Sequence, residues 1–312
     1  MKSFILFLCC LYALQSLGQD SSFRETPVQL KITTGILKGT LTEPVSKKKK
    51  YPVILMIAGS GPTDRNGNNP TMKNDAFRQL AHQLANAGIA TLRYDKRGIA
   101  ESANAGIEEK NMRIDSFIVD AGKWIDTLRS IKRFSSIIVA GHSEGSLIGL
   151  KIASKADKYI SMAGAGRPAD IVIREQLASQ PKPVMEHSYG IMDTLKMGLK
   201  PTVVNPLVLS LFRPSIQDYL ISWFSIDPAK EIAGLKIPIL IIQGTNDIQV
   251  AVKDAELLHA ANPSSKLLLI TDMNHVFRKV QSSRNANIAT YYKTDPPIEK
   301  ELVEAIVGFV KR

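Results

Sequence analysis

One serine of the chain lies in a short pattern that suits a catalytic nucleophile. Ser143 is the centre of Gly141-His142-Ser143-Glu144-Gly145, with a glycine two residues away on either side. Glycine and serine are common residues, so the pattern alone does not establish chemistry. A serine hydroxyl is a poor nucleophile unless a general base lies within reach and is itself held in orientation. The chain must therefore bring a base and an acid to Ser143.

The chain has five histidines, and only His275 is placed as a base should be. It follows an apolar run at 266–271 that predicts a strand. His82 and His259 fall within predicted helices, and His142 stands directly beside the serine. His187 lies in a region without regular strands.

Asp247 is the acid that the spacing favours. It follows the strand predicted for 237–244, and one helix and one strand separate it from His275. Both residues would then lie at the carboxyl end of neighbouring strands, where open α/β sheets bind their ligands. Asp272 is the alternative acid. It stands three residues before His275 in the same loop, and we interpret it as a residue that the solvent hydrates.

Continuous apolar runs indicate the sheet that must position these residues. Such runs are typical of strands buried on both faces of a parallel sheet. They alternate with helix-like stretches, of which 76–88 has the clearest helical spacing, and this alternation predicts an α/β domain with a mostly parallel sheet. A hairpin split by Gly35 precedes them and a helix from about Pro297 ends the chain. The predicted strands are 52–59, 89–95, 135–141, 158–164, 237–244 and 266–271.

The alternation stops between about 167 and 236. This stretch is apolar, is interrupted by prolines such as those at 181, 183, 201, 206 and 214, and contains no strand–helix unit. We expect it to be a helical cap inserted into the α/β domain, with its last part, including Trp223 and Phe224, covering the site.

Two backbone N–H groups are also needed to hold the oxyanion of an acyl-transfer reaction. The residue after the nucleophile, Glu144, would supply one of them. The second should come from the loop after the strand at 52–59. That loop reads Gly59-Ser60-Gly61-Pro62, and Ser60 is the candidate donor.

With these residues in place, the chain resembles the α/β-hydrolase superfamily, in its esterase and serine-aminopeptidase-like (dienelactone-hydrolase-like) branch. The resemblance implies the α/β-hydrolase fold, a triad of Ser143, Asp247 and His275, oxyanion amides at Ser60 and Glu144, and neither a metal nor a cofactor. It rests on the segments IAGSGPTDRNG (57–67), RYDKRGIAES (93–102), GHSEGS (141–146), PILIIQGTNDIQV (238–250) and MNHVF (273–277).

The chain departs from many relatives at two places. Ala58-Gly59 stands where many have His-Gly, and Gly98-Ile99-Ala100 stands where many have Gly-x-Gly. These changes affect the shape of loops and leave the proposed triad intact. The side chains of Glu144 and Arg65 recur in similar enzymes, and we expect them to be structural or to contact substrate.

We therefore expect a serine hydrolase that cleaves a small-molecule carboxylic ester, and the apolar insertion favours a substrate with an apolar group. Three alternatives stay open at this point. They are a peptidase or amidase, a thioesterase, and a binding protein that uses the same fold without catalysis.

The N-terminus has the pattern of a secretory signal peptide. One lysine precedes an apolar run of 11 residues, Phe4–Leu14, and small residues follow, so we expect cleavage after Gly18. A membrane anchor is the alternative, but spanning a bilayer takes about 20 apolar residues. Cys9 and Cys10 are the only cysteines. We expect an exported protein, periplasmic or extracellular, whose mature chain, 19–312, has no disulfide and no integral membrane segment.

The chain is basic, with 40 Lys and Arg against 29 Asp and Glu. Four lysines at 47–50 form one block of this charge. Such a block can bind nucleic acid or can simply be a hydrated loop. No nucleic-acid-binding motif accompanies it, so we expect a loop at the edge of the domain and no nucleic-acid partner.

Overall fold

The computed structural model describes residues 22–46, 48–281 and 283–312. The predicted signal peptide, 1–18, lies outside these residues, as do Cys9 and Cys10. Among the described residues, no helix has the length and apolar character needed to cross a bilayer.

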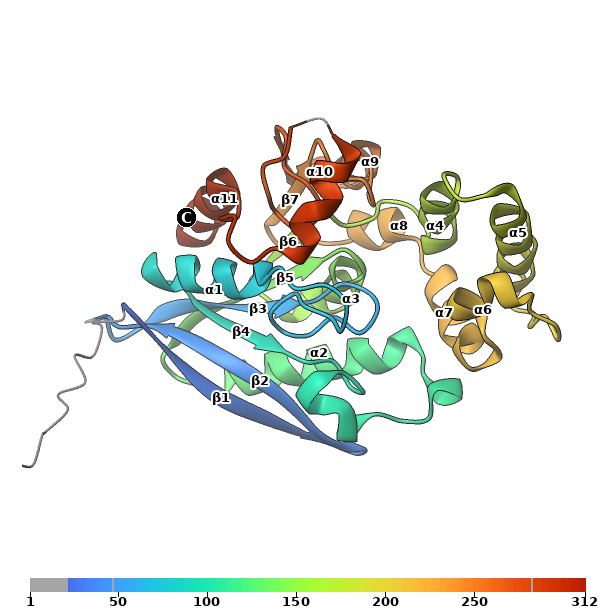
Figure 1. The fold of residues 1–312 in the computed structure, drawn as a ribbon. Helices are drawn as coiled ribbons and strands as arrows, with labels where there is room; N and C mark the ends of the chain where they lie inside the picture. Colours follow the sequence, from blue (N-terminus) through green and yellow to red (C-terminus); the bar gives the residue numbers. More distant parts are fainter. Residues whose placement is uncertain (1–21, 47, 282) are drawn as a thin grey trace, which may run out of the picture.

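One eight-stranded sheet forms the centre of the molecule, in the order β1-β2-β4-β3-β5-β6-β7-β8 (Figure 1). β1 and β2 form the antiparallel hairpin expected around Gly35, and β2 is also antiparallel to β4. The other neighbouring strands are parallel, as predicted. The strands are β1 (Phe23–Ile32), β2 (Gly35–Pro44), β3 (Tyr51–Ile57), β4 (Ala90–Tyr94), β5 (Phe134–His142), β6 (Lys158–Met162), β7 (Ile239–Gly244) and β8 (Lys266–Ile270).

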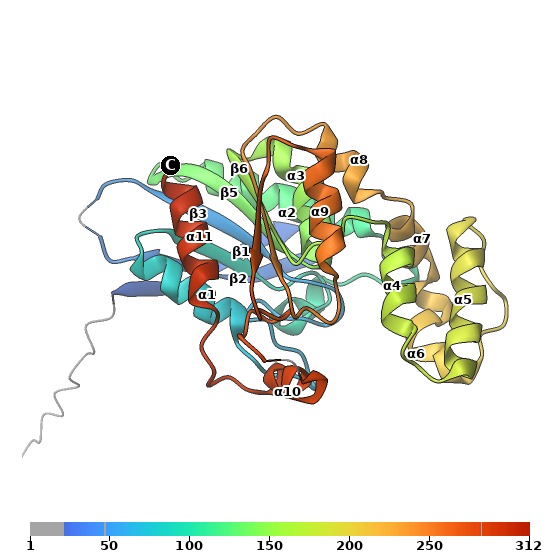
Figure 2. The same cartoon turned by 90° about the horizontal axis from the view of Figure 1, so that it is seen from above.

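Helices cover both faces of the sheet (Figure 2), which explains why its central strands are apolar along their whole length. α1 (Ala76–Asn86) and α11 (Lys300–Lys311) pack their apolar stripes on one face. α2 (Ile114–Arg129), α3 (Glu144–Ile152) and α9 (Val252–Ala261) pack on the other.

The last helix begins slightly later than the sequence pattern suggests. It starts at Lys300 and not near Pro297. The backbone N–H groups of Ile298 and Glu299 donate instead to the Gln79 side chain and to the Phe277 carbonyl oxygen, which holds this segment against distant parts of the chain. One further short helix, α10 (Arg284–Ala289), has no counterpart in the sequence pattern.

Five helices lie between β6 and β7, so the predicted helical insertion is present. They extend beyond the carboxyl ends of the strands, on the right of Figure 1. They are α4 (Ala169–Leu177), α5 (Lys182–Lys196), α6 (Leu209–Phe212), α7 (Gln217–Phe224) and α8 (Pro228–Ala233). Short 3₁₀ helices occur at Ala100–Ala105, Glu109–Asn111, Ala153–Lys155, Pro206–Val208, Pro214–Ile216 and Thr290–Tyr292.

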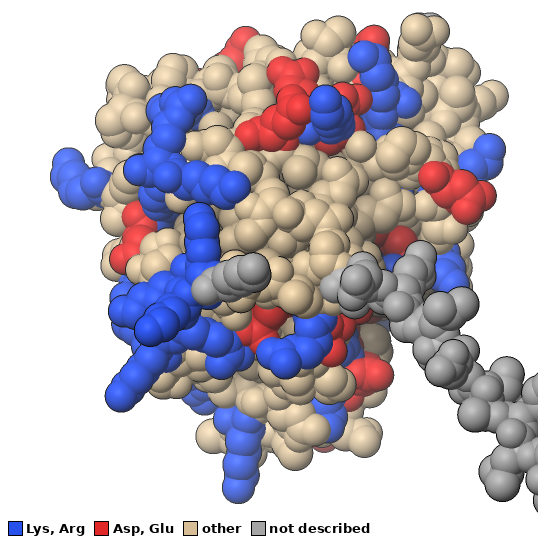
Figure 3. All heavy atoms as spheres, turned by 90° about the vertical axis from the view of Figure 1, so that its left-hand side faces the viewer, with Lys and Arg blue, Asp and Glu red and all other residues tan. Residues whose placement is uncertain are grey.

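Positive charge gathers at the opposite end of the sheet. Lys48, Lys49 and Lys50 lie exposed in the loop between β2 and β3, where the sequence pattern places a loop. Lys132 and Lys266 are exposed at the amino ends of β5 and β8. Figure 3 shows Lys and Arg side chains clustered on this side of the molecule. The basic block is therefore remote from the carboxyl ends of the strands.

Candidate active site

Ser143 occupies the sharp turn between β5 and α3. Its backbone has φ 54° and ψ −123°, a conformation that residues with a side chain rarely adopt and that is found where a fold holds a group for function. A Cβ atom on Gly141 would lie 2.0 Å from the Gly145 carbonyl oxygen, and one on Gly145 would lie 2.2 Å from the Ile57 oxygen. Both glycines of the motif are thus required by close backbone contacts, and together they hold the serine at the strained turn.

His275 and Asp247 meet, as their positions in the sequence predict. Nδ1 of His275 lies 2.7 Å from Oδ2 of Asp247, and their side chains are 5% and 1% exposed. Asp247 Oδ1 also accepts the backbone N–H groups of Gln249 and Val250, at 2.8 and 3.0 Å. The rival acid, Asp272, instead accepts a bond from the Asn246 amide. The carboxylate that orients His275 is therefore that of Asp247.

The same contacts determine the protonation of this pair. Burial raises the pKa of Asp247, but the charge of His275 and the hydrogen bonds to the carboxylate outweigh it, and the net pKa is below its ordinary value. An ionised Asp247 accepts a hydrogen bond from the Nδ1–H group of His275. This arrangement leaves Nε2 as the basic nitrogen of the ring.

His142 connects the serine turn to the His275 loop. Its Nε2 donates to the His275 carbonyl oxygen at 2.9 Å, and the two rings lie 4.5 Å apart. Phe77 and Phe277 enclose the His142 ring edge to face. Burial first, and the charge of His275 second, lower the pKa of His142 to about 3. His142 is therefore a neutral donor that holds the His275 backbone, a role that sequence reasoning missed.

No hydrogen bond within the described residues joins Ser143 Oγ to the His275 ring. The structure thus brings together the acid and the base, and places the serine one residue from the histidine that packs against the base. Catalytic hydrogen bonds are often long until substrate binds, so the contact between Ser143 and His275 stays a prediction.

The two predicted oxyanion donors line the same cavity as Ser143. Glu144 is the first residue of α3, so its N–H has no acceptor within the helix. The loop after β3 passes close to the serine, since a Cβ on Gly59 would lie 3.1 Å from Ser143 Cβ. Ser60 follows directly. The amides of Ser60 and Glu144 as oxyanion donors stay a prediction.

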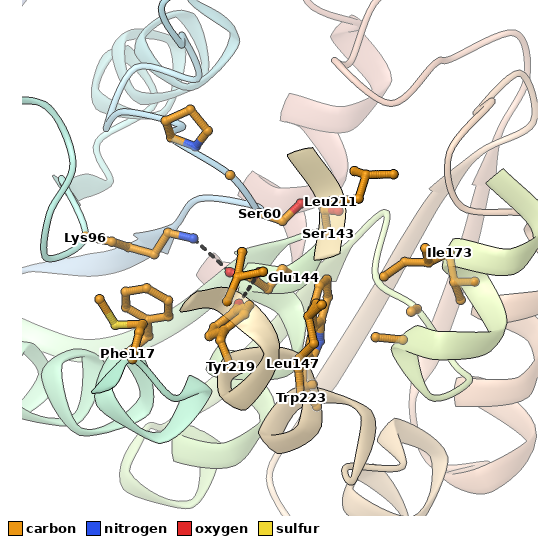
Figure 4. A pocket seen from close by; sticks show the side chains of 18 of the residues that line it. Ser60, Lys96, Phe117, Ser143, Glu144, Leu147, Ile173, Leu211, Tyr219 and Trp223 are labelled. Carbon is orange, nitrogen blue, oxygen red and sulfur yellow. Dashed lines mark hydrogen bonds and ion pairs between the residues drawn. The ribbon is translucent and has the colours of Figure 1, made fainter. Parts of the chain in front are cut away.

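A cavity of about 670 Å³ opens above Ser143, between the sheet and the inserted helices. Its wall is mainly apolar, and Figure 4 shows side chains from α2, α3 and the insertion facing one another across it. Trp223 lines it as expected, whereas Phe224 is wholly buried in the core of the domain. Neighbours on a helix point in different directions, and Phe224 faces inward. The apolar lining includes Phe117, Leu147, Ile173, Leu177, Leu211 and Trp223.

A buried ion pair lies in the floor of this cavity. Lys96, just after β4, pairs with the Glu144 carboxylate at 2.8 Å, and each side chain is 2% exposed. The Tyr219 hydroxyl, from α7, donates to the other carboxylate oxygen (Figure 4). The Glu144 side chain is thus structural, and its partners Lys96 and Tyr219 were not found from the sequence. The one feature of the sequence that could have indicated Lys96 as a site residue is its position at the carboxyl end of a strand.

Arg65 is structural as well. It is buried, binds the Asp95 carboxylate at 2.7 Å and also pairs with Glu101, so it ties the loop after β3 to the loop after β4. It does not line the cavity above Ser143.

Known proteins resemble this chain in sequence and in structure. Residues 72–211 match the family model described as serine aminopeptidase, S33. Esterase EstD of Thermotoga maritima is 28% identical over 313 residues, covering 96% of this chain and 70% of that protein. Est1E from Butyrivibrio proteoclasticus superposes with a TM-score of 0.58 at 14% identity, over 92% of this chain and 99% of that one. The Pyrococcus furiosus esterase Pf2001 superposes with a TM-score of 0.58 at 18% identity, over 94% of this chain and 92% of that one.

Proposed function

We propose, from the premise that this chain is an α/β-hydrolase, that it hydrolyses carboxylic esters through an acyl-enzyme on Ser143. The observation that carries the proposal is the buried Asp247–His275 pair, whose loop contacts the strained turn of Ser143 through His142. The positive φ of Ser143 is a conformation that costs free energy for a residue with a side chain. Strained backbone and buried charge are expected where a protein performs chemistry.

The reaction follows from the roles of these groups. Ser143 Oγ attacks the acyl carbonyl while His275 Nε2 takes its proton, and Asp247 stabilises the resulting imidazolium. The amides of Ser60 and Glu144 hold the oxyanion. The intermediate collapses as His275 returns the proton to the leaving alcohol. Water then attacks the acyl-enzyme by the same route and releases the acid.

The cavity favours an ester with an apolar acyl or alcohol group. Its volume, about 670 Å³, is in the range of sites for small organic ligands. The surface that faces the serine comes from apolar side chains of α4 and α7, such as Ile173 and Trp223. Burial of an apolar group of the substrate against these residues would contribute binding free energy.

A peptidase is the second candidate, because the matching family model is described as a serine aminopeptidase. An aminopeptidase needs a carboxylate that can bind the free amine of its substrate. Only two of the described residues lining the cavity are acidic, and both are engaged. Glu144 binds Lys96 and Tyr219, and Glu109 binds Arg213 and Ser215. These pairings favour the esterase.

A hydrolysis panel tests the proposal. The mature protein is given p-nitrophenyl esters of increasing acyl length alongside aminoacyl and peptidyl anilides, with Ser143→Ala as the control. We expect ester turnover that disappears in Ser143→Ala. Anilide turnover without ester turnover would support the peptidase, and ester turnover that survives in Ser143→Ala would refute the mechanism.

We also propose that residues 1–18 are a cleaved signal peptide and that the protein is exported. The support is the sequence pattern alone: a lysine, an apolar run of 11 residues and small residues before Gln19. Expression of the full chain in a bacterial host, followed by fractionation and mass spectrometry, should find a protein that begins at Gln19 outside the cytoplasm. Recovery of an uncleaved chain from the cytoplasm or the membrane would contradict export.

A further inference from the structure

One buried ammonium group contacts both parts of the predicted oxyanion hole. Nζ of Lys96 donates to the Gly59 carbonyl oxygen at 2.6 Å and to Oε1 of Glu144 at 2.8 Å. It also lies 5.0 Å from the centre of the Phe117 ring. Gly59 precedes Ser60, and Glu144 follows Ser143. The side chain of Lys96 thus joins the loop after β3 to the first residue of α3.

The bond to Gly59 fixes the direction of the Ser60 amide. The Gly59 carbonyl and the Ser60 N–H belong to one peptide group, which is planar and trans, so the two bonds point in opposite directions. A carbonyl held toward Lys96 turns the Ser60 N–H away from Lys96. Ser60 is drawn between Lys96 and Ser143 in Figure 4, so this is the side on which the serine lies.

The bond to Glu144 fixes the second donor. Both carboxylate oxygens are held, one by Lys96 and the other by the Tyr219 hydroxyl. With its side chain anchored at two points, Glu144 cannot rotate the first turn of α3 away from the serine. Tyr219 belongs to the inserted helix α7, so the same network also fixes the insertion against the site.

A role in packing alone does not account for this ion pair. Removing an ammonium and a carboxylate from water costs more free energy than burying two apolar side chains of the same size, and buried pairs are often no more stable than such a replacement. The pair does give what an apolar contact cannot, which is a directional bond to a carbonyl oxygen.

We propose that Lys96 is a positioning residue for the oxyanion hole: its ammonium orients the peptide of Gly59 and Ser60 and the start of α3 so that the amides of Ser60 and Glu144 converge on the oxyanion. The inference rests on the ester hydrolysis proposed above. Lys96 acts through these two residues and not on the substrate.

The test replaces Lys96 and separates binding of the transition state from binding of the ground state. Lys96→Met keeps the length of the side chain and removes its charge. With a short p-nitrophenyl ester we expect kcat to fall by about ten- to a hundred-fold, since loss of one oxyanion donor costs about 10²–10³, while KM changes by less than about two-fold. A trifluoromethyl ketone, which forms a tetrahedral adduct with the serine, should lose affinity by the same factor as kcat.

Two further variants keep the test valid if Lys96→Met misfolds and compare the sizes of the losses in kcat. Lys96→Arg keeps the charge but changes its geometry, and should also lower kcat. It provides the test if Lys96→Met does not fold. Glu144→Gln keeps the shape and leaves the Gly59 bond in place, so its loss of kcat should be smaller than that of Lys96→Met. Lys151→Met, which removes the partner of Glu231 on the outer side of α3, is the matched control and should retain full activity.

Folded Lys96→Met and Lys96→Arg enzymes with unchanged kcat and unchanged ketone affinity would overturn the inference. A fall in kcat with unchanged ketone affinity would overturn it too, because the loss would then lie outside the oxyanion hole. The proposed function fails separately, when Ser143→Ala retains ester turnover.

Discussion

Nδ1 of His275 lies 2.7 Å from Oδ2 of Asp247, and both side chains are almost wholly removed from solvent. Two strand ends that are distant in the sequence must be placed accurately for this contact to form. Two backbone N–H groups, from Gln249 and Val250, hold the carboxylate in turn. The pair is therefore preorganised before substrate binds, which is what a base that must act in one orientation requires.

Loss of the acid should affect kcat far more than folding. Asp247→Asn keeps the size of the side chain but can donate to Nδ1, which favours the wrong tautomer of His275. We expect kcat for esters to fall by about 10⁴-fold, the scale seen when a triad acid is replaced by its amide. Steady-state kinetics beside circular dichroism would measure this. Asp272→Asn is the control, and a larger effect there than in Asp247→Asn would reverse the assignment of the acid.

The wall of the cavity should set the preference for acyl length. Trp223→Ala removes a large apolar surface opposite the serine, so we expect kcat/KM for an octanoyl ester to fall about ten-fold, on the scale of a few lost methylene contacts. Acetyl ester turnover should change by less than about two-fold. Leu209→Ala, an exposed position on α6 outside the lining, is the control. Equal losses for both esters would contradict the proposed position of the acyl chain.

The half-buried His142 should make the protein sensitive to mild acid. Its pKa is about 3 in the folded protein and about 6.5 in the unfolded chain. The unfolded chain therefore takes up a proton first as the pH falls through 6.5, and the free energy of unfolding decreases from there toward pH 3. Between pH 7.5 and 5.0 this contribution is about 2 kcal/mol.

Urea unfolding at these two pH values measures the effect. His142→Gln keeps a donor for the His275 carbonyl and cannot titrate, so its loss of stability between pH 7.5 and 5.0 should be smaller than that of the natural protein by about 2 kcal/mol. His187→Gln, at an exposed position of the insertion, should leave the difference unchanged. The same pH dependence in His142→Gln and the natural protein would contradict the lowered pKa of His142, because His142 would then take up a proton equally well in the folded and unfolded chains.

The glycines of the serine turn should tolerate no side chain. In Gly145→Ala the new Cβ would meet the Ile57 carbonyl oxygen at 2.2 Å, and we expect a loss of about 3 kcal/mol or more, since backbone cannot yield as a side chain can. Gly190→Ala, in the exposed middle of α5 with nothing within 4 Å, should instead gain about 0.5–1 kcal/mol. Thermal unfolding of both variants and of the natural protein measures these changes in stability. A Gly145→Ala protein as stable as the natural one would contradict the close packing of β3 against the turn.

The elements that position the site could be predicted from local sequence, because each carries its own signal. The apolar run of β5, the glycines around Ser143 and the apolar residues of α3 are all contiguous in the chain. Asp247 and His275 could be assigned because each directly follows a strand, and parallel strands bring their carboxyl ends to one edge. The same rule predicts that Ser143 lies beside this pair, and a hydrogen bond between Ser143 and His275 stays a prediction.

Long-range side-chain contacts could not be predicted in this way. Lys96 meets Glu144 48 positions further along the chain, and no local pattern marks which cation pairs with which carboxylate. α10 was missed for the same reason. It has no apolar stripe, and its Asn287 is held by bonds to the Asn246 carbonyl and the Asn274 amide from distant loops. The direction in which Phe224 points likewise depends on neighbours that only the folded chain supplies.

Covalent labelling tests most directly whether Ser143 is the nucleophile. A fluorophosphonate reacts with an activated serine and is retained, so the labelled protein can be digested and the modified residue located by mass spectrometry. We predict one adduct, on the peptide that contains Ser143, formed in proportion to the loss of ester hydrolysis and absent from His275→Ala. Inactivation with the adduct on another residue, or full ester turnover after complete modification of Ser143, would contradict the proposed function.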